Sequence, residues 1–279
     1  MKRVIRMILA GALALSLAAC GAPLAVETPV PTAAPTVAPT ADPTPEPLAE
    51  PVVEFTDDAL EDMVRKAMGK PEGDITVAEA EAVERFDFRV QDPSSSSTPR
   101  IKDISALQYF KNLQSLDLSY HQIEDLAPLA GMKNLFALYY FDARSVKDFS
   151  ALSELTGMMD LIISSDSFTN ADMQRLAGMT KMEMLWIQGG KELTDISVVT
   201  NFKNLQRLNI EFSGVTDLSP AAGLTSLVEV SLRGSDVSDV SPLKDLVNLK
   251  SLYLEDCPVT DYSPLADIYP NLENKDFEM

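Results

Sequence analysis

The sequence repeats itself every 22 to 24 residues, and this period restricts the possible folds more than any other feature. In each unit, a first apolar residue is followed by apolar residues at alternating positions. The first apolar residues of seven successive units are Leu113, Leu135, Met158, Met182, Leu205, Leu227 and Leu249. One such unit cannot bury its own apolar side chains, so neighbouring units must stack to form a continuous core. The period therefore predicts a solenoid.

Each unit combines two kinds of local structure. The alternating segment, as in Leu116-Asp117-Leu118, predicts a β-strand with one buried face. Serine followed by proline, as in Ser219-Pro220, favours the start of a short helical turn, with serine as its N-cap. The period and the L-x-x-L-x-L core are those of a leucine-rich repeat. We therefore expect an α/β solenoid, a leucine-rich-repeat horseshoe with a parallel β-sheet on its concave face and short helical turns on its convex face.

Two segments make this expectation more specific. Residues 101–107 read Ile-x-Asp-Ile-Ser-x-Leu and residues 237–243 read Val-x-Asp-Val-Ser-Pro-Leu, and both resemble the internalin-type repeats of bacteria. The resemblance extends over residues 83–277 and implies a column of asparagines after the strands. In this sequence the asparagines are absent. The equivalent positions, which we call the ladder column, are occupied by His121, Ala143, Asp166, Gly190, Ser213, Ser235 and Cys257. The sequence also departs from the internalin-type pattern at residues 169–176, which lack Ser-Pro and predict a longer helix.

The N-terminal residues have the pattern of a secretory signal. Basic residues stand at positions 2, 3 and 6, and the apolar run at 7–17 is too short for a normal transmembrane helix. Leu17-Ala18-Ala19-Cys20 follows and resembles the lipobox of bacterial lipoproteins. The resemblance implies that residues 1–19 are a lipoprotein signal peptide and that Cys20 carries a lipid, which anchors the chain at the extracytoplasmic face of the cell membrane. The alternative is an ordinary signal peptide with an incidental cysteine.

Composition separates the remainder into three parts. Residues 20–51 are expected to be the lipidated cysteine and a Pro/Thr-rich linker, because nine prolines fall between positions 22 and 51 and such a segment cannot bury a core. Residues 52–82 are expected to form a helical N-terminal cap, which covers the end of the solenoid. Residues 83–279 are expected to be the leucine-rich-repeat domain.

Two local patterns lie within these parts. Apolar residues at helical spacing predict a first helix that starts at Thr56 or Asp57 and ends at Gly69, and Thr76-Val77-Ala78-Glu79 predicts a capping box for a second helix. The serine-rich segment 89–100 interrupts the repeats and predicts a mobile loop.

Composition and motifs exclude several functions. The chain has 23 Lys and Arg against 42 Asp and Glu, a formal net charge of −19, so it lacks the basic surface that nucleic acid requires. Two cysteines and one histidine are too few for most zinc sites. The sequence contains neither G-x-S-x-G nor H-E-x-x-H. We therefore expect no catalytic residue, no metal site, no cofactor and no enzymatic turnover.

Three groups of reactive or charged residues have structural explanations. Cys257 is expected to be a small buried residue with an inert thiol, and His121 to be a loop or ladder residue. One aspartate recurs in each unit, at Asp103, Asp125, Asp148, Asp195, Asp217, Asp239 and Asp261. Hydrogen bonds within the turn explain this column, and calcium binding is the less favoured alternative because each unit supplies only one carboxylate.

The outward strand positions predict a binding surface. Alternation places an unusual set of large side chains side by side on three neighbouring strands, namely Tyr139, Phe141, Ile162, Met184 and Trp186. Arg207, Arg233 and Tyr253 point to the same face on later strands. Exposed apolar patches bordered by charge mark binding sites, and Trp, Tyr and Arg dominate binding hot spots. The alternative is that irregular repeats turn some of these side chains inward.

The pattern as a whole favours a membrane-anchored binding protein. We expect its ligand to be a protein that binds the concave face of the repeats, and we expect the chain to be monomeric. Aromatic rings also stack on sugars, so a cell-wall or host glycan is the main alternative ligand. A structural scaffold in an envelope assembly, without a single ligand, is the other alternative.

Overall fold

A computed structural model describes residues 50–279 of the chain. The predicted signal peptide, Cys20 and most of the predicted linker lie outside the described residues. None of the helices within 50–279 is long and apolar enough to cross a membrane.

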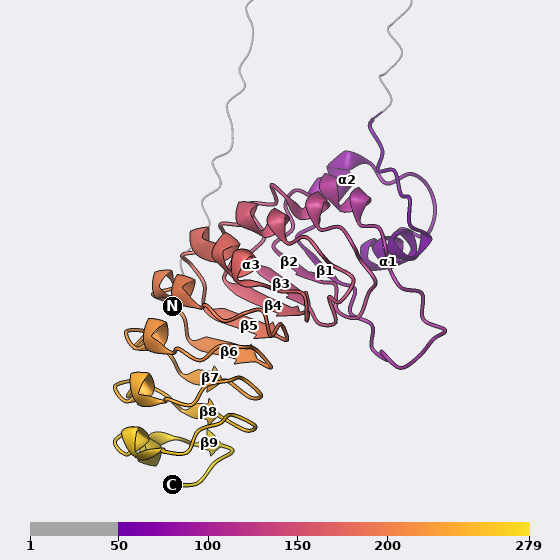
Figure 1. The fold of residues 1–279 in the computed structure, drawn as a ribbon. Coiled ribbons are helices and arrows are strands. Elements are labelled where there is room, and N and C mark those ends of the chain that lie inside the picture. Colours follow the sequence, from indigo (N-terminus) through magenta and orange to yellow (C-terminus); the bar gives the residue numbers. More distant parts are fainter. Residues whose placement is uncertain (1–49) are drawn as a thin grey trace, which may run out of the picture. The chain divides into compact units, whose positions relative to one another are not determined.

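A single parallel sheet runs through the described residues, and its strands stack in the order of the chain (Figure 1). The nine strands are β1 Arg85–Asp87, β2 Ser115–Asp117, β3 Ala137–Tyr140, β4 Asp160–Ser164, β5 Met184–Gln188, β6 Arg207–Glu211, β7 Glu229–Ser231, β8 Ser251–Tyr253 and β9 Asn274–Lys275. Each strand pairs with the next without a crossover, because each repeat returns the chain to the neighbouring position. The predicted leucine-rich-repeat solenoid is confirmed.

Short helical turns lie on the other side of each coil from its strand (Figure 1). They are 3-10 helices rather than α-helices: η1 Ser105–Tyr109, η2 Ala127–Leu129, η3 Ser150–Glu154, η4 Leu176–Gly178, η5 Ser197–Asn201, η6 Ser219–Ala221, η7 Ser241–Leu243, η8 Ser263–Leu265 and η9 Tyr269–Asn271. The sequence departs from the short-turn pattern at 169–176, and there the structure has the predicted longer helix, α3 Asn170–Arg175, with a Thr169–Asp172 capping box.

The core is the column of inward side chains between sheet and turns. Leu116, Leu138, Leu161 and Leu185 occupy the same register position on β2 to β5 and are almost fully buried. One continuous apolar cluster extends from Val53 to Leu272. Burial of apolar surface is the main stabilising contribution in such a stack, since each strand is too short to be stable alone.

The aspartate column begins each turn. In all seven units its carboxylate accepts a hydrogen bond from the backbone N–H two residues later, at 2.7 or 2.8 Å. The prediction of turn hydrogen bonds is confirmed. The prediction that serine caps the turns is wrong: Ser219, for example, is the first residue of η6, and its backbone N–H donates to Asp217.

Two helices precede the first strand. Helix α1 spans Asp58–Met68 and α2 spans Val77–Glu81. The N-cap of α1 is Asp57, one of the two predicted residues, and the helix ends at Gly69, whose left-handed backbone has a φ of 65°. Asp57 Oδ2 also accepts hydrogen bonds from the backbone N–H groups of Lys102 and Asp103, at 2.8 and 3.1 Å. The same carboxylate therefore starts α1 and ties it to the first repeat.

The segment 89–100 contains no helix or strand, and two side chains hold it. Arg100 donates hydrogen bonds to the carbonyls of Pro93, Ser95 and Tyr120 at 2.9 to 3.2 Å. His121, buried in the ladder column, accepts from Ile101 N–H through Nδ1 at 3.0 Å and donates from Nε2 to Phe88 O at 2.7 Å. The predicted loop is therefore closed at its base by the histidine.

Candidate functional site

The register of the sheet brings the predicted side chains together. Tyr139 on β3 pairs with Ile162 on β4, and Ile162 pairs with Trp186 on β5, as the alternation predicts. Met184 lies one outward position earlier on β5, and Phe141 directly follows β3. We call these five side chains the aromatic patch, and the outward face of the sheet that carries them the sheet face.

The five members of the patch are not equally accessible. Tyr139, Phe141 and Trp186 are half-buried, whereas Ile162 and Met184 are only 8% and 7% exposed. The expectation that all five form an open strip is therefore corrected. Ile162 lies between two larger side chains on strands spaced about 4.8 Å apart, so its neighbours cover it. Ile162 and Met184 form the floor of the patch, and the three aromatic rings form its accessible part.

Trp186 is held in a defined orientation. Its ring packs edge to face against Phe141, with centroids 5.2 Å apart and planes at 90°. Its Nε1–H donates a hydrogen bond to Glu211 Oε2 at 3.1 Å. Glu211 is only 5% exposed and also accepts a hydrogen bond from Ser231 Oγ at 2.5 Å. A buried carboxylate therefore fixes the indole, a role that alternation alone does not reveal.

The aromatic surface continues beyond the predicted residues. The rings of Phe141 and Tyr120 are stacked with centroids 6.3 Å apart. The guanidinium of Arg89 lies 5.7 Å from the Tyr120 centroid and 5.8 Å from that of Phe141. Both distances are in the range of cation–π attraction. Sequence reasoning missed Tyr120 because it follows its strand and is not an outward strand position. It missed Arg89, which shares the outward column of Phe141, because that residue lies in the irregular unit before residue 113.

Charged groups border the patch. The Tyr139 hydroxyl donates to Asp160 Oδ2 at 3.5 Å. The pKa of Tyr139 is raised, mainly because the side chain is partly buried and secondarily because the negative charge of Asp160 is close. Arg207, the partner of Met184 on the next strand, is exposed. The structure therefore places Arg207 next to the patch with its cation open to solvent.

Arg233 and Tyr253 lie apart from the patch. Tyr253 has the same register as Trp186 but is three strands further along the sheet. Arg233 lies over the Tyr253 ring, 4.2 Å from its centroid, and its Nε donates to Asp276 Oδ2 at 2.9 Å. These two predicted site residues belong to a cluster that joins the last strands of the sheet.

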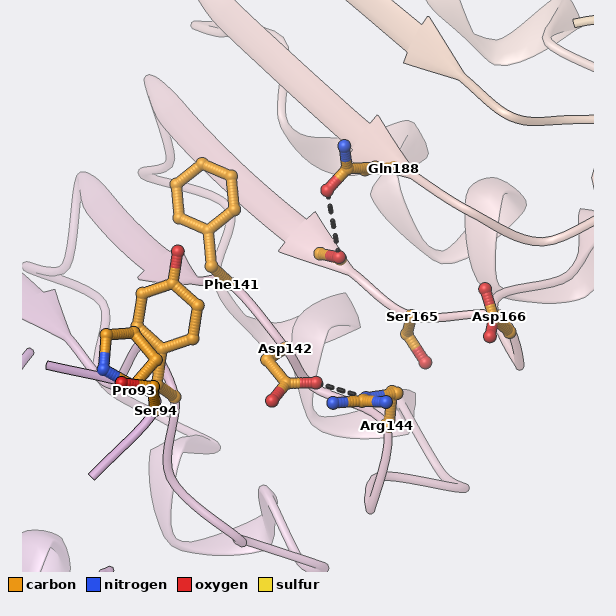
Figure 2. A pocket seen from close by; sticks show the side chains of 10 residues that line it. Pro93, Ser94, Phe141, Asp142, Arg144, Ser165, Asp166 and Gln188 are labelled. Atoms are coloured by element: carbon orange, nitrogen blue, oxygen red, sulfur yellow. Dashed lines mark hydrogen bonds and ion pairs between the residues drawn. The ribbon is translucent and has the colours of Figure 1, made fainter. Parts of the chain in front are cut away.

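A pocket of about 510 Å³ opens beside the patch, at the ends of β3, β4 and β5 (Figure 2). Phe141 and Tyr120 line it, so one wall of the pocket is the edge of the aromatic surface. The loop contributes Pro93 and Ser94. The remaining lining residues are Asp142, Arg144, Ser164, Ser165, Asp166 and Gln188. Sequence reasoning missed this pocket because it combines the irregular loop with residues that follow the strands.

The histidine and the cysteine within residues 50–279 are engaged in structural bonds. Both ring nitrogens of His121 bond to backbone, and burial lowers its pKa, so the imidazole is neutral and has no free nitrogen. The Cys257 thiol donates to Leu232 O at 2.9 Å, and burial raises its pKa. No cluster of metal-binding side chains occurs among residues 50–279. Neither His121 nor Cys257 is therefore placed to act as a nucleophile–base pair.

These features define a class of protein. Stacked coils with one parallel sheet, short turns preceded by a hydrogen-bonding aspartate and an aromatic surface on the sheet make a leucine-rich-repeat solenoid, a fold whose extended surface binds other molecules. No protein-family model matches the sequence, and a search of curated proteins found no match.

Solved structures of similar fold place the chain beside bacterial leucine-rich-repeat proteins. Internalin C2 from Listeria monocytogenes is 28% identical, with a TM-score of 0.69, and the match covers 83% of this chain and 99% of that one. Another internalin of the same organism is 22% identical over 81% of this chain and 96% of its own, with a TM-score of 0.44. The PEPR1-AtPEP1 structure shares the fold at 16% identity, with a TM-score of 0.52, over 63% of this chain and 26% of that one.

Proposed function

We propose that this chain is a membrane-anchored, extracytoplasmic protein that recognises a protein ligand through the sheet face. The observation that carries the proposal is the aromatic patch. Three half-buried rings, Tyr139, Phe141 and Trp186, lie together on a rigid sheet, and the buried Glu211 fixes one of them. Preorganised aromatic side chains bordered by charge have the properties of a binding hot spot.

The size of the surface favours a protein over a single sugar unit. Charged side chains border the patch from Asp117 on β2 to Glu229 on β7. Five strand spacings correspond to about 24 Å, which is the width of a protein footprint. Arg207 offers an exposed cation within this span. A glycan and a ligand-free scaffold role are the alternative outcomes of the experiment below.

Capture of ligand by the full chain, immobilised and exposed to the proteins of the cell surface and its surroundings, tests the proposal. Trp186→Ala and Arg207→Ala should each weaken capture, by at least tenfold for Trp186, because burying a tryptophan in an interface commonly contributes about 2 kcal/mol or more. The Arg207 variant is informative because this side chain is exposed and its loss leaves the core intact.

Val247→Ala is the matched control, since Val247 is 62% exposed but follows η7, in the part of the coil that carries the turns. It should capture ligand like the unchanged chain. Equal capture by all the variants would contradict a sheet-face site. Binding that survives protease treatment of the ligand but not removal of its sugars would identify a glycan instead.

The membrane anchor is a separate part of the proposal and rests on the lipobox-like Leu17-Ala18-Ala19-Cys20. Metabolic labelling with a fatty acid should tag the unchanged chain, and Cys20→Ala should abolish the label, because the cysteine thiol is the acceptor that the pattern implies. Equal labelling of the two chains would contradict the anchor without affecting the proposed binding site.

A further inference from the structure

We propose that the pocket at the ends of β3 to β5 receives a basic side chain, arginine or lysine, of the protein that binds the sheet face. This inference rests on the proposed function and names the chemistry of the ligand. It is carried by three observations: aromatic walls that hold a cation, acidic groups on the rim, and the continuity of the pocket with the aromatic patch.

The aromatic wall already lies beside one cation. Tyr120 and Phe141 line the pocket, and the same two rings lie 5.7 and 5.8 Å from the guanidinium of Arg89, which is not part of the lining. The negative faces of aromatic rings attract positive charge, and arginine is the usual partner. A second cation that enters the pocket meets rings of the same chemistry.

Acidic groups outnumber basic ones in the lining. Asp142 and Asp166 are the carboxylates, and Arg144 is the single cation (Figure 2). Arg144 bonds to Asp142 through an exposed side chain, whereas Asp166 makes no hydrogen bond or ion pair within residues 50–279. An incoming guanidinium or ammonium therefore finds one free carboxylate and one whose present partner is exposed and able to move aside.

Two lining residues hold an unusual backbone. Tyr120 and Asp142 follow β2 and β3 at equivalent positions, and both have positive φ, 69° and 65°. This left-handed conformation is uncommon for residues other than glycine, and aromatic residues gain nothing from it locally. It turns the Tyr120 ring and the Asp142 carboxylate toward the same pocket. The same position is left-handed after β6 and β8, at Phe212 and Asp256, so the backbone of the coil, rather than the pocket, sets this conformation.

The pocket and the patch share a wall. Phe141 lines the pocket and contacts Trp186 on its other side, with 5.2 Å between the ring centroids. A ligand that covers the patch can therefore insert a neighbouring basic side chain without leaving the surface. The strongly acidic chain, with a net charge of −19, also favours a basic partner during association.

A fluorescence titration of the full chain tests the inference, because Trp186 is the only tryptophan and reports on Phe141. The probes are N-acetyl-arginine amide, the uncharged isostere N-acetyl-citrulline amide, and tri-N-acetylglucosamine. The arginine probe should give a saturable change at least tenfold tighter than citrulline, and 0.5 M salt should weaken it. The sugar should give none.

Substitutions locate the binding. Asp166→Asn and Asp142→Asn should each weaken the arginine probe by at least fivefold. Asp256→Asn is the matched control, because Asp256 occupies the position equivalent to Asp142 after β8, with a φ of 60°, and lies outside the lining. It should bind the probe like the unchanged chain. Circular dichroism checks that each variant is folded.

Equal affinity for arginine and citrulline, or no saturable response to either, would overturn the inference. A response to the sugar alone would make the pocket a carbohydrate site. This outcome can be separated from that of the proposed function. If the Asp166→Asn variant captures the protein ligand normally and the Trp186→Ala variant does not, the sheet face is the binding site but the pocket does not hold a basic side chain of the ligand.

Discussion

At the scale of single residues, Glu211 is a charged side chain that is buried on the outward side of a sheet. It accepts hydrogen bonds from Trp186 and Ser231, at 3.1 and 2.5 Å, and only 5% of it is exposed. A carboxylate is stable in such a place only when hydrogen-bond donors surround it. Its role is therefore to position Trp186, and it acts on the ligand through that ring.

Replacing Glu211 with alanine should loosen Trp186. We expect a red shift and stronger iodide quenching of the single tryptophan, and a loss of about 1 to 3 kcal/mol in the free energy of unfolding, because buried donors lose their acceptor. Glu255→Ala is the matched control, since Glu255 occupies the equivalent position after β8 but is exposed. An unchanged Trp186 spectrum in Glu211→Ala would show that the carboxylate does not position the ring.

His121 should make stability depend on pH below neutrality. Burial lowers its folded-state pKa from about 6.5, so the unfolded chain takes up a proton first as the pH falls. Stability is therefore fully present above about pH 6.5 and decreases below it, by at most about 1.4 kcal/mol per pH unit. Protonation would also remove the acceptor for Ile101 N–H.

Urea denaturation between pH 5 and 7.5 measures this dependence. His121 is the only histidine, so His121→Gln should flatten the profile in this range. A profile with the same slope in both chains would contradict the assignment of the effect to His121.

At the scale of elements, the sequence could predict the strands. It could predict only in part which residues start the turns and which side chains on the sheet are covered by their neighbours. Strands followed from alternation, and the turns from the aspartate and serine-proline pattern. The pattern could not show whether the serine or the aspartate two residues earlier accepts the hydrogen bond at the start of each turn, since both side chains are good acceptors. It also treated Ile162 and Met184 as exposed, because alternation gives the face of a side chain but not the size of its neighbours.

The pocket was beyond sequence reasoning for a related reason. Its lining comes from the loop at 93–94 and from Tyr120 and Asp142, which have positive φ and follow the strands. The positive φ of such residues is a property of the assembled coil, and no local pattern distinguishes them from ordinary turn residues. The recurrence of positive φ at this position becomes visible only when neighbouring coils of the structure are compared.

Asp57 should be the residue that fastens α1 to the first repeat. Burial by itself would raise its pKa, but hydrogen bonds from the backbone of Lys102, Leu60 and Asp103 outweigh this and lower it. Asp57→Ala should cost about 1 to 2 kcal/mol and reduce amide-exchange protection over α1, because three backbone donors lose an acceptor. Asp58→Ala, one residue later, is the control. Equal protection of α1 in both variants would contradict this role.

At the scale of the whole molecule, residues 53 to 272 share one apolar core, so the described repeats should unfold together. Within these residues, brief subtilisin treatment should cut first in 89–100, the long segment without helix or strand. Thermal unfolding should show a single transition. Early cleavage at 165–175 or two separate transitions would instead show that the irregular unit around α3 divides the stack.

The central claim is that the sheet face binds a protein, and photo-crosslinking in living cells tests it most directly. A benzoyl-phenylalanine placed at Tyr139 should form adducts with a protein of one defined mass, because Tyr139 borders Trp186 through Ile162 on the sheet face. The same group at Val247, which is exposed beside a turn, should give none. Adducts from Val247 but not from Tyr139, or equal adducts from both, would contradict the claim.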